Sequence, residues 1–259
     1  MKKKFLSLSV AALAAATLGG NAQAVPVSLE LALLVDVSGS VNATEYNLQK
    51  TGYINAFNNA GLQNAIASLP GGIAVTYIEW SSAASQAQLV GWTHVSDATT
   101  SDAFATAVDA TSRAFGGATA PGSAINFANP LFTNNGFEGA RWIIDISGDG
   151  QQNSGANTAG ARDAFLGQTP VGEGSSIAIN GLPIGGGLTL QNWYQNNIVG
   201  GPNSFLIAAN DFTDFENAVL RKLEREIGGG QVPVPAPLAL IGLGLVGLIT
   251  MRCRSLVAA

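Results

Sequence analysis

Three oxygen-bearing side chains follow an apolar run near the start of the chain. Residues 31–35 are apolar, and Asp36, Ser38 and Ser40 then come at alternate positions, with Gly39 between the serines. Hard divalent cations prefer such oxygen ligands, and a glycine lets the backbone bend so that the ligands converge. The pattern predicts a buried strand that ends in a cation-binding turn. Aspartate and serine are also ordinary turn and cap residues, so this stretch alone does not decide between the two readings.

Two later turns offer oxygen ligands in a comparable setting. Thr119 lies in a turn rich in glycine, threonine and proline, over residues 116–122. Asp149 lies in the sequence Ser-Gly-Asp-Gly, which directly follows the apolar run 141–146. An apolar run that ends in a carboxylate on a glycine turn therefore occurs twice in the chain, which strengthens the prediction of a site.

The elements that must position these turns alternate between strand and helix. Strands are predicted over residues 29–35, 73–80, 86–95, 141–146, 176–180 and 204–209. Helices are predicted over 42–68, 99–113, 159–166, 188–198 and 212–227, the last with strong charge on one face, and one further helix ends near 131. This order predicts an α/β fold, with a doubly wound, mostly parallel central sheet and helices on both faces. Residues 86–95 follow so short a loop that they must form an antiparallel edge strand.

In such a sheet, ligands bind beyond the carboxyl ends of the strands, where these polar turns fall. At this point the chain resembles the von Willebrand factor A family. The metal-ion-dependent adhesion site of that family has D-x-S-x-S after the first strand, a threonine in a Gly-rich loop and an aspartate after the fourth strand. The resemblance spans residues 29–227, and the matching positions are Asp36, Ser38, Ser40, Thr119 and Asp149.

The last motif departs from the Thr-Asp-Gly of many family members. Asp149 follows Ser147 and Gly148, a form that resembles a bacterial, largely uncharacterised branch of exported members. This departure bears on the identity of the partner rather than on the metal.

The resemblance implies binding through a shared cation, without covalent chemistry. Its ligand set has two carboxylates and three hydroxyls, which fits Mg²⁺ best, with Mn²⁺ or Ca²⁺ as substitutes. Three neutral hydroxyls leave the charge of the cation only partly compensated. An acidic protein side chain or an anionic polysaccharide of a partner is therefore expected to complete the shell.

Two other classes of function stay open, a metal-dependent hydrolase that activates water and structural cargo of a matrix. Thiol catalysis is excluded, because Cys253 is the only cysteine and lies in the C-terminal tail. A serine hydrolase is disfavoured, because His94 is the only histidine and no Gly-x-Ser-x-Gly elbow accompanies it. Glu79 and Asp97 are interpreted as ordinary solvated carboxylates near strand ends.

Both ends of the chain carry patterns of protein export. Residues 1–24 combine three lysines, an apolar run and an A-x-A site, which predicts a signal peptide cleaved after Ala24. Residues 25–227 are predicted to form the A-like domain, 228–237 a Gly/Pro linker, and 238–259 an apolar anchor with an arginine tail. The end of the chain resembles the PEP-CTERM sorting signal in its VPxPA form. This resemblance implies an exosortase partner and transient anchoring in the inner membrane, with the body in the periplasm, at the cell surface or in the extracellular matrix.

The composition of the body limits its partners. Between the two signals lie seven basic and seventeen acidic residues, a net charge of −10. Such a surface repels nucleic acid and anionic lipid and attracts cations. The same segment has no cysteine, so its core must hold it together without disulfides.

Overall fold

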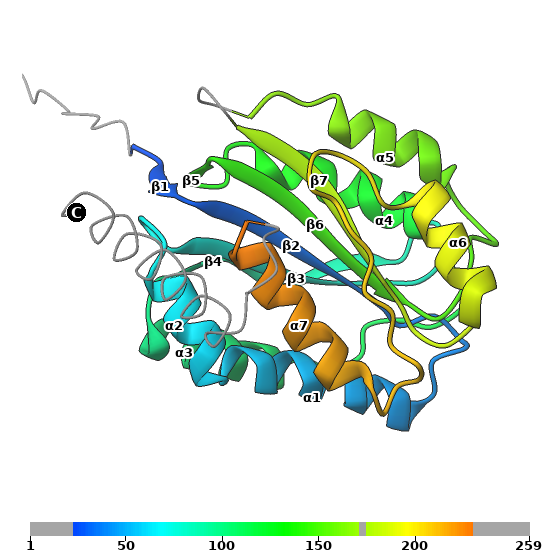
Figure 1. The fold of residues 1–259 in the computed structure, drawn as a ribbon. Coiled ribbons are helices and arrows are strands. Elements are labelled where there is room, and N and C mark those ends of the chain that lie inside the picture. The colour runs from blue at the N-terminus through cyan, green and yellow to red at the C-terminus, as the bar shows by residue number, and fades with distance from the viewer. Residues whose placement is uncertain (1–22, 171–174, 230–259) are drawn as a thin grey trace, which may run out of the picture.

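The computed structural model describes residues 23–170 and 175–229, which form one five-stranded sheet between two helical layers (Figure 1). The strands β2 (Leu29–Asp36), β3 (Ile73–Trp80), β4 (Gln86–Val95), β6 (Arg141–Gly148) and β7 (Ser176–Pro183) lie in the order β4-β3-β2-β6-β7. Only β4 runs antiparallel to its neighbour in this sheet. The predicted doubly wound α/β fold with one antiparallel edge strand is therefore confirmed.

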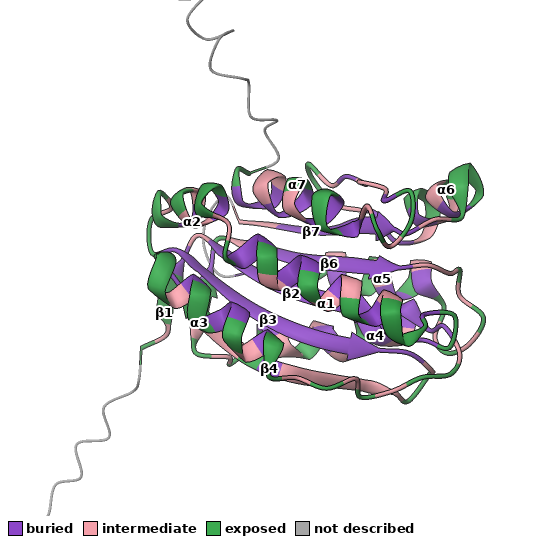
Figure 2. Cartoon of the chain, turned by 90° about the horizontal axis from the view of Figure 1, so that it is seen from below, coloured by how far each residue is buried: buried purple, intermediate pink, exposed green. Residues whose placement is uncertain are grey.

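Helices cover both faces of the sheet (Figures 1 and 2). One layer contains α1 (Ala43–Phe57), α2 (Ala60–Ala67), α3 (Ala98–Asp109) and α7 (Phe215–Ile227), and the other contains α4 (Pro121–Ala128), α5 (Thr158–Leu166) and α6 (Gly187–Asn197). The central strand β2 supplies both cores, because alternate side chains of a strand point to opposite faces. Leu31 and Leu33 pack under the first layer, and Ala32 and Leu34 pack under the second.

Four local features differ from the prediction. The segment predicted as one helix over 42–68 is two helices, because Asn59 accepts hydrogen bonds from the amides of Gly61 and Leu62 and starts α2 anew. The predicted strand over 204–209 forms only isolated bridges, from Leu206 to Gly181 of β7 and from Ala209 to Ile184, the residue that follows β7. A small parallel sheet of β1 (Val25–Val27) and β5 (Phe137–Gly139), and the 3₁₀ helix η1 (Asn129–Phe132), were not predicted, because such short segments show no periodicity.

None of the helices in residues 23–170 and 175–229 has the length and apolarity needed to cross a bilayer. The predicted signal peptide and the PEP-CTERM-like tail lie almost entirely in residues 1–22 and 230–259, outside the described part. The division of the chain into export signals, domain and linker therefore stays a prediction.

Candidate metal site

The D-x-S-x-S turn leaves the carboxyl end of β2 and folds back on its own aspartate. Oδ1 of Asp36 accepts a hydrogen bond of 2.8 Å from the amide of Ser38. The amide of Gly39 then donates to the carbonyl of Gly117 at 2.7 Å, so the turn is attached directly to the loop that carries Thr119. A Cβ at Gly39 would lie 3.1 Å from that carbonyl oxygen, which explains the glycine at this close approach.

The structure brings the side chains of all three loops together. Ser38 Oγ lies 3.2 Å from Ser40 Oγ and 3.4 Å from Thr119 Oγ1. Ser40 in turn donates a hydrogen bond of 2.7 Å to Oδ1 of Asp149, which follows β6. The predicted residues thus form one connected oxygen cluster, although the sequence separates Ser40 from Asp149 by 109 positions.

The cluster has a buried floor and an accessible rim. Asp36 and Ser38 are fully buried and Thr119 is 5% exposed, whereas Ser40 is exposed and Asp149 half-buried. A ligand from solvent can therefore approach on the side of Ser40 and Asp149. The floor stays shielded from water.

The two carboxyl groups are in an unfavourable setting without a cation. Burial raises the pKa of Asp36 to about 7, against the hydrogen bonds from Ser38, and the nearby charge of Asp149 raises it further. Burial also raises the pKa of Asp149, against the hydrogen bond from Ser40. In the described part of the chain, Oδ2 of Asp36 is buried and has no hydrogen-bond partner. A hard cation fits this all-oxygen set, since it would compensate both charges and the unpaired oxygen.

The set depends on hydroxyls more than on carboxylates. Residues 23–170 and 175–229 contain no cluster of three or more histidine, cysteine, aspartate or glutamate side chains suited to a metal. Two carboxylates and three hydroxyls suit Mg²⁺, which takes few carboxylates, and the five side chains would leave part of its octahedral shell to water or to a partner.

Arg113 and Asn153 support the site, and sequence analysis did not assign a role to either. One guanidinium nitrogen of Arg113 donates to the carbonyls of Val37 and Ser38 at 2.8 and 2.9 Å, and so holds the metal-motif turn by its backbone. The side-chain oxygen of Asn153 accepts from the amide of Thr119 at 2.8 Å. Asn153 lies four residues after Asp149, so its place close to a predicted site residue was the one signal in the sequence that could have pointed to it.

Glu79 corrects one interpretation from the sequence, because its side chain is fully buried rather than solvated. It accepts hydrogen bonds from the hydroxyl of Tyr46 at 2.9 Å and from the amide of Ala114 at 2.8 Å, and so holds the loop before Thr119 against β3. Asp97 is an exposed cap of α3. His94 on β4 pairs with Ala74 near the start of β3. It therefore lies at the end of the sheet that is opposite the oxygen cluster.

A comparison with known families identifies the family of the chain. One family model matches residues 26–231. The chain belongs to that family, Protein of unknown function (DUF1194). A comparison of the DUF1194 chain with curated proteins gave no match.

Solved structures with a similar fold include matrix and adhesin proteins. Proximal thread matrix protein 1 from the mussel byssus has a TM-score of 0.57 and 16% identity, over 78% of this chain and 48% of that one. A second structure of that protein, described as having a zinc-occupied MIDAS motif, has a TM-score of 0.55 and 16% identity, over 77% and 45%. The pilus adhesin SpaC from Lactobacillus rhamnosus GG has a TM-score of 0.50 and 16% identity, over 77% and 30%.

These likenesses establish the fold, which is the doubly wound α/β fold of the von Willebrand factor A type. The DUF1194 chain spans about half the length of the mussel protein. That the oxygen cluster of this chain binds metal stays a prediction.

Proposed function

We propose that this protein is a non-catalytic binding module that holds a divalent cation, preferably Mg²⁺. The proposed ligands are Asp36, Ser38, Ser40, Thr119 and Asp149. The observation that carries this proposal is the convergence of five oxygen-bearing side chains from three separate loops. One of them, Asp36, has a buried carboxylate oxygen that finds no hydrogen-bond partner in the described part of the chain.

The chemistry of the rim supports a role in binding. Asp36 and Asp149 bring negative charge, while the three hydroxyls are neutral, so a bound cation would supply a positive centre that remains open to a further ligand. Gly116 and Gly117 beside the cluster are exposed and carry no side chain, so they leave room for an incoming group. An acidic protein side chain or an anionic polysaccharide of a partner has the matching charge.

The similar solved structures support this class of function, because one is described with a zinc-occupied MIDAS motif and another is named as a pilus adhesin. With the export patterns at both ends, the proposal extends to a protein at the cell surface or in the extracellular matrix. An exosortase-type system would sort it there by its C-terminal segment.

Calorimetric titration of the purified protein with Mg²⁺ tests the metal site. Wild type should bind, and Asp36→Ala and Asp149→Ala should each abolish binding. Asp97→Ala is the matched control, because Asp97 is an exposed aspartate that only caps α3. Folded wild-type protein that binds neither Mg²⁺ nor Mn²⁺, Ca²⁺ or Zn²⁺ would reject the proposal.

Retention on immobilised polyglutamate and polygalacturonate tests the kind of partner. Retention that requires the cation and is lost with a chelator supports binding through a shared metal. Retention that a chelator leaves unchanged contradicts this mechanism, as does failure of the metal-loaded protein to bind either polymer.

A further inference from the structure

Two buried polar atoms without partners in the described residues lie close to Gly148, at the candidate metal site. The hydroxyl of Tyr194, on α6, and Oδ2 of Asp36 are both buried, and within the described part of the chain neither has a hydrogen-bond partner. A Cβ added at Gly148 would lie 2.6 Å from Asp36 Oδ2 and 2.8 Å from the Tyr194 hydroxyl. Both atoms therefore approach the α-carbon of Gly148, and that position has no space for a side chain.

The chemistry of the two atoms is complementary. A phenol donates one hydrogen bond, whereas a carboxylate oxygen only accepts and has two lone pairs. Oδ2 of Asp36 can accept from Tyr194 with one lone pair and face a cation with the other. Carboxylates that bind metals are commonly held by such a second hydrogen bond, which fixes their orientation.

The position of Tyr194 suits this role, because its ring is held by packing. Tyr194 is fully buried, with 0% of its surface accessible to solvent, and it belongs to the apolar cluster on the α4–α5–α6 side of the sheet. Its ring contacts Trp193 with a centroid distance of 5.7 Å. A phenylalanine would pack here equally well and would bury no hydroxyl, so packing alone does not account for a tyrosine.

We propose that Tyr194 is a positioning residue of the metal site, whose hydroxyl donates to Oδ2 of Asp36 through one bridging water molecule. The hydroxyl thereby fixes the orientation in which Asp36 holds the cation. This inference rests on the proposed function. It adds α6 to the three loops that the sequence assigns to the site.

Tyr194→Phe in the full chain tests the proposal, with Tyr77→Phe as the matched control. Tyr77 is equally buried and its hydroxyl is also without a partner in the described residues, but it lies on β3, faces the other helical layer and has Glu79 as the carboxylate that acts on it. We expect Tyr194→Phe to weaken Mg²⁺ binding about tenfold and Tyr77→Phe to change it less than about twofold. Both variants should keep the urea midpoint of the metal-free wild type.

A spectroscopic measurement separates positioning from a general effect on the fold. Mg²⁺ should change the tyrosine band of the near-ultraviolet difference spectrum in wild type and Tyr77→Phe, and this change should be missing in Tyr194→Phe at saturating metal. Wild-type affinity in Tyr194→Phe, or equal losses in both variants, would overturn the role of Tyr194. Failure of wild type itself to bind metal would overturn the proposed function, and it is seen before any variant is made.

Discussion

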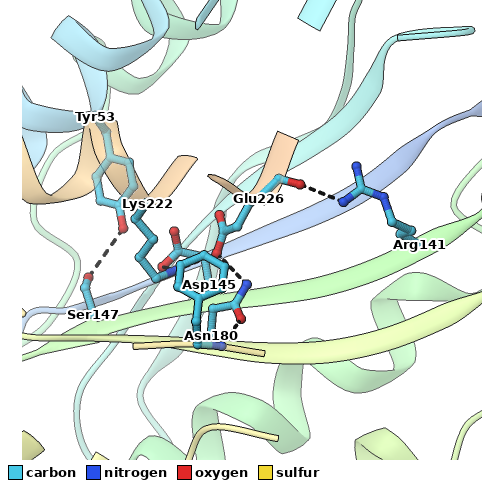
Figure 3. Close-up of polar contacts among 8 residues, drawn as sticks. Tyr53, Arg141, Asp145, Ser147, Asn180, Lys222 and Glu226 are labelled. Carbon is cyan, nitrogen blue, oxygen red and sulfur yellow. Dashed lines mark hydrogen bonds and ion pairs between the residues drawn. The ribbon is translucent and has the colours of Figure 1, made fainter. Parts of the chain in front are cut away.

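Replacing Lys222 by methionine should destabilise the protein strongly, because this lysine pairs with two buried carboxyl groups (Figure 3). Its Nζ lies 2.6 Å from Oδ1 of Asp145, in the middle of β6, and 2.7 Å from Oε1 of Glu226, one turn later on α7. All three side chains are fully buried. Asn180 on β7 donates a further hydrogen bond of 2.9 Å to Glu226, so the cluster connects α7 to two strands.

The expected cost follows from the charges that remain. Methionine has nearly the volume of lysine, so Lys222→Met removes the charge and leaves two buried carboxyl groups side by side. Breaking a buried ion pair by removing one partner costs about 3–5 kcal/mol. We expect a loss of that size in the free energy of unfolding at pH 7.5, measured by urea denaturation.

The pH dependence gives the sharper test. In the wild type, burial and the charge of Asp145 raise the pKa of Glu226 to about 7, and burial raises that of Asp145. A carboxyl group with a raised pKa binds its proton more tightly in the folded state, so its contribution to stability is present at low pH and is lost as the pH rises through that pKa. Without Lys222 both pKa values rise further, and the deficit of Lys222→Met should therefore shrink between pH 7.5 and pH 5.

Two controls complete this experiment. Arg221→Met removes an exposed cation from the preceding position of α7 and should change stability by less than about 0.5 kcal/mol. Asp145→Asn combined with Lys222→Met removes one of the two uncompensated carboxylates and should recover part of the loss. A Lys222→Met protein within about 1 kcal/mol of wild type, or a deficit that is the same at both pH values, would refute this reasoning.

Three further predictions concern the site and the fold. Arg113→Met should weaken Mg²⁺ binding about tenfold in calorimetry without loss of the fold, because the carbonyls of Val37 and Ser38 lose the hydrogen bonds from this side chain. Unchanged affinity would contradict a supporting role for Arg113. Gly148→Ala should abolish Mg²⁺ binding while the circular dichroism spectrum is kept, because the added methyl would lie 2.6 Å from Asp36 Oδ2. A variant that binds Mg²⁺ normally would show that this oxygen does not bind the cation. Asn59→Ala should lower the free energy of unfolding by about 1 kcal/mol through loss of the α2 cap, whereas Asn59→Asp should keep most of it.

The central strands and the oxygen cluster could be predicted from sequence, because their signals are local. An apolar run that ends in Asp36, or in Ser147-Gly148-Asp149, marks a buried strand and its carboxyl end without knowledge of any distant residue. The parallel sheet then brings such ends to one edge. The break at Asn59 was missed because the apolar spacing of the two helices continues across it.

The contacts that orient the site were not predictable in the same way. Arg113 reaches the motif across 75 positions, and the packing of α6 is what brings Tyr194 close to Gly148 and the site. The charged face of the last helix was predicted, but a pattern of charge does not reveal that Lys222 and Glu226 face the core. Their burial depends on Asp145 and Asn180, which neighbouring strands supply.

The hydrogen bond between the main chains of Gly39 and Gly117 joins two loops of the oxygen cluster without using any side chain. Backbone atoms fasten the two loops, so replacing a neighbouring side chain does not cut this connection. At Gly116 an added Cβ would meet no atom within 4 Å. A side chain introduced at Gly116 could therefore add a recognition group beside the cluster without disturbing the backbone contact that joins the two loops.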